Sequence, residues 1–211
     1  MRAVLAGIAA ALIFSACGSV LAPPAAVVRG HKIRANDLTG PLDRFEASDQ
    51  FRQAAQQQSA KAVARQFEQS YLARIIRRYV LSARARDLGV TVTAADVQKA
   101  ITQIQGTFPD AAAFRKALQQ QGLTFAQLRP LVRDRVLEQK LRAKVTAGIS
   151  SRAAQDQAWV RWLMSAYRAA NVKVNPRYGV FDLATQTIVN GSDQFPGAPS
   201  PSPSLSPSPA G

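Results

Sequence analysis

The sequence predicts a mostly α-helical domain of several helices, with a small antiparallel sheet formed by strands near the two ends of the chain. Three observations carry this prediction. Apolar residues recur at helical spacing, capping signals separate the helical stretches, and alternating apolar segments occur near residues 26–33 and 172–189. The 211 residues are 47% hydrophobic and 19% charged, which is typical of a globular domain with a core.

The N-terminal part of the domain is expected to hold one β segment and a long helix. Residues 26–33 form the β segment, bent at Gly30, and residues 36–38 can cap a short helix after it. A Gln-rich stretch, 50–61, then leads into the long helix, which Gly89 is expected to close in a left-handed conformation. Seven residues give this helix a wide apolar face: Phe67, Tyr71, Leu72, Ile75, Ile76, Tyr79 and Val80.

Three further helices are expected next, each with its own start signal. Residues 93–96 (TAAD) and 124–127 (TFAQ) both match a capping box, and Asp110 is expected to cap the helix between them. Pro130 lies inside the third of these helices, where it removes one backbone hydrogen bond and is expected to kink the helix.

The C-terminal part is expected to combine one helix with short strands. The helix covers about residues 151–170, where aromatic and apolar side chains recur at helical spacing. Residues 172–174 alternate like a strand, and residues 178–189 are expected to form a hairpin around residues 184–186.

Residues 1–16 are predicted to be a lipoprotein-type signal peptide. Arg2 precedes an apolar run that is shorter than the roughly 20 residues needed to cross a bilayer. The segment Phe14-Ser15-Ala16-Cys17 resembles the bacterial lipobox, although that pattern prefers Leu where Phe14 stands. Cys17 is therefore expected to be lipidated, with acyl chains such as palmitate. Two alternatives remain: Cys17 is an incidental residue, or a signal peptidase cuts after Ala22, next to an unfavourable proline.

These signals divide the chain into four parts. After the signal peptide, residues 17–25 are expected to tether the domain to the membrane, and residues 26–191 to form the folded domain. Residues 192–211 are rich in Ser and Pro and are expected to be a disordered, extended tail. A passive spacer is the favoured interpretation of the tail, and glycosylation of its serines is the alternative.

The composition also limits the chemistry that is available to the chain. It contains one His and one Cys, which excludes a Cys/His zinc site, an iron–sulfur cluster and an internal disulfide. The sequence contains no P-loop, dinucleotide-binding, zinc-protease or serine-hydrolase motif. We therefore expect no catalytic residues, no metal and no cofactor, and the chain is not predicted to be an enzyme.

Several segments resemble the SurA and PrsA family of extracytoplasmic chaperones, and the region 88–141 is the most specific. The segment Leu88-Gly89-Val90-Thr91-Val92-Thr93 looks like the family's helix junction. The similarity continues at six further places: 26–28, Asp96-Val97, Phe114, 121–124, 127–129 and 174–179.

The resemblance implies that the two terminal strands pair and that the protein binds unfolded or partly folded secreted polypeptides without ATP, as a holdase. Relatives commonly insert a parvulin-type prolyl isomerase domain after the equivalent of residue 146. Only a short connection occupies that place here, so no isomerase activity is expected. Together with the lipobox, the resemblance predicts a lipid-anchored protein on the outer face of the bacterial cell membrane.

Two sets of side chains are candidates for binding. Apolar grooves between helices suit an extended client, and five aromatic residues are the candidate contacts: Phe67, Tyr71, Trp159, Trp162 and Tyr167. Four arginines are candidates to face an anionic partner: Arg74, Arg77, Arg78 and Arg133. The alternatives are that the aromatic residues form the core and that the arginines form an ordinary solvated helix face.

A net charge of +14 favours an anionic partner, such as acidic clients or an anionic membrane or cell-wall surface. Nucleic acid is not expected, because the signal sequence directs the chain out of the cytoplasm. The alternative function is a structural or adaptor lipoprotein that binds a folded envelope partner or an anionic envelope polymer. Its affinity would rest on two basic clusters and would fall steeply with salt. The first cluster comprises Arg65, Arg74, Arg77, Arg78, Arg84 and Arg86, and the second comprises Arg129, Arg133, Arg135, Lys140, Arg142 and Lys144.

Overall fold

The computed structural model describes residues 23–191. The expected signal peptide, Cys17, most of the tether and the Ser/Pro tail lie outside the described residues. Within them the chain forms seven α-helices and five short β-strands, which confirms the predicted mostly α-helical class.

The helices are α1 (Asn36–Glu46), α2 (Asp49–Gln57), α3 (Ala60–Asp87), α4 (Ala94–Gln105), α5 (Ala111–Gln120), α6 (Phe125–Val145) and α7 (Arg152–Ala170). The strands are β1 (Ala26–Val28), β2 (His31–Ile33), β3 (Lys173–Val174), β4 (Val180–Asp182) and β5 (Thr187–Val189).

The two ends of the folded domain meet in a three-stranded antiparallel sheet with the order β2-β1-β3. Ala26 pairs with Val174 across the β1–β3 ladder, which confirms that N- and C-terminal strands join. The predicted bend at Gly30 is a complete hairpin turn, because Arg29 and Gly30 both adopt positive φ, 50° and 80°. β4 and β5 form a separate antiparallel hairpin, as expected for residues 178–189.

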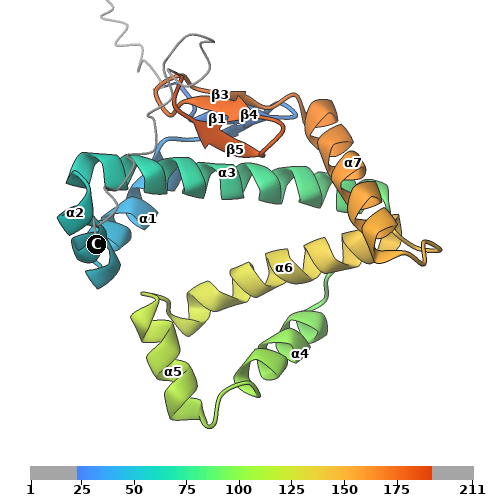
Figure 1. The fold of residues 1–211 in the computed structure, drawn as a ribbon, viewed down its shortest axis with the longest axis horizontal. Coiled ribbons are helices and arrows are strands. Elements are labelled where there is room, and N and C mark those ends of the chain that lie inside the picture. The colour runs from blue at the N-terminus through green and yellow to red at the C-terminus, as the bar shows by residue number, and fades with distance from the viewer. Residues whose placement is uncertain (1–22, 192–211) are drawn as a thin grey trace, which may run out of the picture.

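The main core lies between the sheets, α3, α7 and the C-terminal half of α6 (Figure 1). Leu72, Ile76 and Val80 of α3 are almost completely buried in it. The other side of the predicted apolar face is more open: Phe67, Tyr71 and Ile75 are half-buried, and Tyr79 is exposed. The buried face of α3 is therefore narrower than the apolar face that the sequence predicts.

A second, smaller cluster of buried residues joins α4, α5 and the N-terminal half of α6, and these helices form a triangle beside α3 in Figure 1. Ile101 of α4 and Phe114 of α5 lie in this cluster with Val132 of α6. Leu137 and Leu141 of the same helix belong to the main core. The helix α6 therefore connects the two cores, and the chain between α6 and α7 is only the segment 146–151.

Four of the predicted helix ends depend on local capping, and the structure confirms them. Thr93 with Asp96 and Thr124 with Gln127 both form complete capping boxes. The Asp110 side chain accepts a hydrogen bond from the Ala113 amide at the start of α5. Gly89 follows α3 with φ +65°, and the Val90 amide donates to the Ala85 carbonyl, as in a Schellman motif. The helix α6 continues through Pro130.

The Gln-rich stretch 50–61 was expected only to lead into the long helix, but it contains the separate helix α2, and Ser59 caps the start of α3. The start of α1 has no side-chain cap, contrary to the expectation for residues 36–38.

Candidate functional site

A cavity of about 400 Å³ lies between α3 and α6. Side chains three and four residues apart on each helix project toward it, because such residues share one helix face. Eleven residues line it: Arg74, Arg77, Arg78, Leu81, Leu131, Asp134, Arg135, Leu137, Glu138, Gln139 and Arg142. The lining thus combines leucine side chains with five arginines and two carboxylates.

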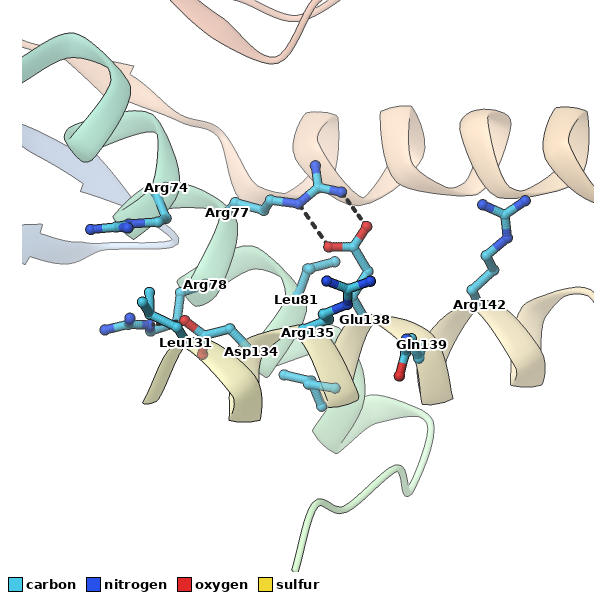
Figure 2. A pocket seen from close by; sticks show the side chains of 11 residues that line it. Arg74, Arg77, Arg78, Leu81, Leu131, Asp134, Arg135, Glu138, Gln139 and Arg142 are labelled. Atoms are coloured by element: carbon cyan, nitrogen blue, oxygen red, sulfur yellow. Dashed lines mark hydrogen bonds and ion pairs between the residues drawn. The ribbon is translucent and has the colours of Figure 1, made fainter. Parts of the chain in front are cut away.

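Two ion pairs cross the cavity from α3 to α6. Figure 2 shows the pair between Arg77 and Glu138 as dashed lines. The Arg77 guanidinium donates two hydrogen bonds to the Glu138 carboxylate, from Nε to Oε2 at 3.1 Å and from Nη2 to Oε1 at 2.6 Å. Arg78 Nε donates to Asp134 Oδ2 at 2.7 Å. Arg77 also donates from Nη1 to Gln186 Oε1 at 2.9 Å, which adds the β4–β5 turn to the same network. These contacts fix the spacing of the two helices.

The Arg77–Glu138 pair affects the ionisation of Arg77. Burial opposes the charged guanidinium, but the hydrogen bonds and the charge of Glu138 outweigh it, so the pKa of Arg77 is raised. Burial raises the pKa of the Tyr167 hydroxyl, which lies near this pair on α7. Both groups therefore keep one protonation state across the physiological range.

The remaining arginines of the lining differ in their partners. Arg142 pairs with Asp156 of α7. In Figure 2, Arg142 and Arg74 lie at opposite ends of the lining. Within residues 23–191, Arg74 and Arg135 form no ion pair with a carboxylate. Both side chains are exposed. Two cationic groups at this cavity are thus available to an anionic group of a ligand.

A row of aromatic rings runs from α2 and α1 along α3 to Arg74. Phe51 packs edge-on against Phe45, Phe45 stacks on Phe67 with centroids 4.2 Å apart, and Phe67 stacks on Tyr71 at 5.7 Å. The Arg74 guanidinium lies 4.5 Å from the centre of the Tyr71 ring. All four rings are half-buried. We call these four residues the aromatic row, and Arg74 links it to the cavity.

The structure brings only some of the predicted binding residues together. Phe67 and Tyr71 belong to the aromatic row, and Arg74, Arg77 and Arg78 line the cavity. Arg133 is exposed on α6 and is not part of the lining.

The predicted aromatic residues of α7 lie elsewhere, in and beside the main core. Trp159 and Tyr167 are 6% and 2% exposed. Trp162 is half-buried and stacks on Trp159 with centroids 5.0 Å apart. In this arrangement, only Trp162 of the three offers substantial surface to a ligand.

Sequence reasoning missed the residues that complete the site. Phe45 and Phe51 precede the long helix. The only sequence feature that could have indicated them is that two aromatic residues occur within a polar, Gln-rich region. Asp134 and Glu138 lie in a helix with many charges, and no local pattern distinguishes their cavity-facing side chains from solvated ones. Arg135 was recognised only as a member of the second basic cluster and not as a separate binding residue. Helical spacing of acidic residues opposite Arg77 and Arg78 was the only available signal.

Two general findings complete the description of residues 23–191. No helix in this region combines the length and apolar character needed to cross a membrane. In the same region, no group of three or more His, Cys, Asp or Glu side chains is placed to hold a metal ion.

Comparison with known proteins gives one match. A family model described as SurA-like N-terminal domain matches residues 1–142. The match extends from the N-terminus through almost all of α6, and it includes every residue that lines the cavity. No curated protein and no solved structure matches the chain.

Proposed function

Because this chain belongs to the family of SurA-like N-terminal domains, we propose that it binds unfolded or partly folded secreted polypeptides as an ATP-independent holdase without prolyl isomerase activity. The family is chaperone-type and extracytoplasmic, which supports this choice of client and compartment. The short segment 146–151 between α6 and α7 is consistent with a domain that works by binding alone.

The cavity between α3 and α6 is the observation that carries the proposal. Its volume of about 400 Å³ is large enough for one or two side chains of an extended polypeptide. Leu131 is half-buried and offers an apolar contact, with the buried Leu81 and Leu137 behind it. The arginines around it offer donors for client carbonyl and carboxylate groups. Such a mixed lining suits many sequences, which a general chaperone requires.

The aromatic row extends the proposed client surface beyond the cavity. Phe67 and Tyr71 retain exposed ring surface, and client side chains can pack on them. We include Trp162 as a further contact on α7. Trp159 and Tyr167 are proposed to support Trp162 from within the core rather than to contact a client, because almost none of their surface is exposed.

Lipidation of Cys17 is part of the same proposal. The lipobox-like segment before Cys17 supports an anchor at the outer face of the cell membrane, with residues 17–25 as the tether. An anchored holdase would meet secreted polypeptides as they leave the membrane. The net charge of +14 would also hold the domain near anionic lipid headgroups or wall polymers.

An adaptor lipoprotein for a folded partner or an anionic envelope polymer is the second candidate. The exposed arginines favour it, since Arg133 and Arg129 of α6 project outside the cavity. Binding of this kind would be dominated by charge and would weaken strongly as salt rises. Capture of unfolded clients would persist at high salt because it also uses apolar contacts.

Suppression of aggregation at low and high salt tests the proposal. Residues 18–211 are mixed with a chemically unfolded model protein, and light scattering is followed. Both apolar clusters lie within residues 25–188, so this chain retains the whole described core. Suppression that survives high salt is the expected result. Suppression at low salt alone would favour the adaptor, and no suppression at either salt would refute the holdase.

A pair of variants ties the activity to the site. Tyr71→Ala removes one ring of the aromatic row and should weaken suppression. Phe125→Ala is the matched control, because Phe125 is 44% exposed on α6 and lies outside both the row and the cavity lining. Equal suppression by the two folded variants would remove the aromatic row from the site.

A further inference from the structure

We propose that the cavity selects client segments in which an aspartate or glutamate lies next to an aromatic residue, with Arg74 and Arg135 as the carboxylate contacts. This inference rests on the proposed function and adds a substrate class to it. It follows from the way that charges are paired within the cavity and from the position of Arg74.

The charges of the lining do not balance. Five arginines face two carboxylates, and both carboxylates are already bound by Arg77 and Arg78. Arg142 is bound by Asp156 outside the lining. Across residues 23–191, this leaves Arg74 and Arg135 at the cavity without a carboxylate partner. The lining therefore holds excess positive charge beside leucine side chains.

The pairing separates the arginines by role. The ion pairs of Arg77 and Arg78 hold α3 against α6, so these two arginines maintain the shape of the cavity. Arg74 and Arg135 are exposed, and no contact of this kind fixes them. A client carboxylate can bind them without breaking an existing ion pair.

Arg74 has a geometry that suits a carboxylate next to an aromatic residue. Its guanidinium lies over the Tyr71 ring at 4.5 Å, so one face is used by the ring. The N–H groups of a guanidinium point outward in its own plane, and they remain open to a bidentate carboxylate. Tyr71 in turn ends the aromatic row. A client ring on the row and a carboxylate at Arg74 would thus occupy neighbouring positions.

Fluorescence anisotropy with labelled peptides tests the selection. Three peptides share a neutral Gly/Ser backbone and one Phe, and the residue after Phe is Asp, Asn or Lys. Residues 18–211 are expected to bind the Asp peptide about tenfold more tightly than the Asn peptide, since a hydrogen bond to a charged group is worth that much. The Lys peptide should bind most weakly.

Arg74→Gln and Arg135→Gln are each expected to reduce the Asp-to-Asn ratio toward one while leaving the Asn peptide bound. Arg133→Gln is the matched control, because Arg133 is an exposed arginine of α6 outside the lining. It should keep the full ratio. Circular dichroism of each variant checks that the helices are intact.

The outcomes separate this inference from the proposed function. If wild type binds all three peptides equally, or if Arg133→Gln lowers the ratio as much as Arg74→Gln, the selection is refuted and holdase binding stands. If the wild type binds none of the peptides and suppresses no aggregation, both proposals fail. If vesicles of anionic phosphatidylglycerol bind in an Arg74-dependent way and no peptide does, the site is a lipid site and the inference is overturned.

Discussion

Asp96 stabilises the start of α4 and links α4 to α6. Its Oδ2 atom accepts hydrogen bonds from the Thr93 amide at 2.8 Å and from Lys140 Nζ at 2.6 Å. The hydrogen bond from Lys140, with those from Thr93, lowers the pKa of Asp96 from 3.8 to about 2. The charged carboxylate is thus favoured by the folded state over the unfolded chain.

This shift predicts the pH dependence of stability. Because the pKa is lower in the folded state, the contribution of Asp96 is fully present above pH 3.8 and is lost as pH falls through about 2. Asp96→Asn should lower the thermal midpoint near neutral pH, and the difference from wild type should vanish at about pH 2. Thermal unfolding followed by circular dichroism across pH measures it. A difference that stayed constant down to that pH would contradict the assignment.

Among the glycines that the structure describes, Gly179 leaves the least room for a side chain. Its φ is +122°, and a Cβ atom there would overlap the backbone oxygen of Val189. Gly179→Ala should therefore lower the free energy of unfolding by about 2 kcal/mol or more.

Gly106→Ala is the control for this strain, because Gly106 has right-handed backbone angles and no contact shorter than 3.5 Å at the new Cβ. It should change stability by less than about 1 kcal/mol. Urea unfolding of both variants decides the point. Equal effects would show that strain at Gly179 is not the cause.

At the scale of elements, α6 is the structural link of the domain. Its N-terminal half packs on α4 and α5, and its C-terminal half packs in the main core. Two arginine–carboxylate pairs fasten the same helix to α3. A helix that packs on two sides holds both cores at fixed positions around the cavity.

The α4–α5–α6 cluster is expected to open while the main core stays folded, whereas opening of the main core is expected to unfold both clusters. Ile101→Ala removes a completely buried side chain from the α4–α5–α6 cluster, at a cost of about 2–5 kcal/mol. Amide hydrogen exchange should become faster in α4 and α5 and stay slow in α3 and the sheet.

Leu141→Ala is the counterpart in the main core, where Leu141 is also completely buried. It should accelerate exchange throughout the described residues. Uniform acceleration in both variants would mean that the domain opens as one unit.

Local signals in the sequence were sufficient to predict four of the helix ends, although not the break between α2 and α3. Thr93, Asp110, Thr124 and Gly89 act on backbone groups within a few residues, so their roles follow from neighbouring residues alone. The resemblance in residues 88–141 covers the same capped region, and it predicted the family.

Contacts between distant segments could not be predicted from the sequence pattern. The apolar residues of α3 cover a wider arc than the core fills, and only packing against α7 and the sheet selects Leu72 over Tyr71 for burial. Arg77 and Glu138 are 61 positions apart, and nothing near either residue shows that they meet. For the same reason, sequence grouped Arg77 with Arg74, although Arg77 pairs with Glu138 and Arg74 has no carboxylate partner within residues 23–191.

The whole molecule combines a cationic folded domain with an expected membrane anchor. The arginines of α3 and α6 lie on both sides of the cavity, so we expect the domain to be attracted to anionic surfaces in several orientations. The anchor and the charge act together in this proposal, since a tether raises the local concentration of the domain at the membrane.

Cys17→Ser should release the protein from the membrane. A lipid-modified Cys17 predicts that wild type partitions into the membrane fraction and resists a salt wash, whereas Cys17→Ser appears in the soluble fraction at high salt. Fractionation of bacteria that express each form, followed by immunoblotting, gives the result. Membrane retention of Cys17→Ser after the salt wash would exclude Cys17 as the anchor.

Site-directed cross-linking tests most directly whether the α3–α6 cavity holds the client. Cys17 is the only cysteine, so Cys17→Ser gives a thiol-free background for a single photoreactive label. Gln139→Cys places the label in the cavity lining, and Gln119→Cys places it on the exposed surface of α5. With an unfolded secreted protein, we predict strong cross-linking from Gln139→Cys and only background from Gln119→Cys. Equal yields, or cross-linking from Gln119→Cys alone, would contradict the assignment of this cavity as the client site.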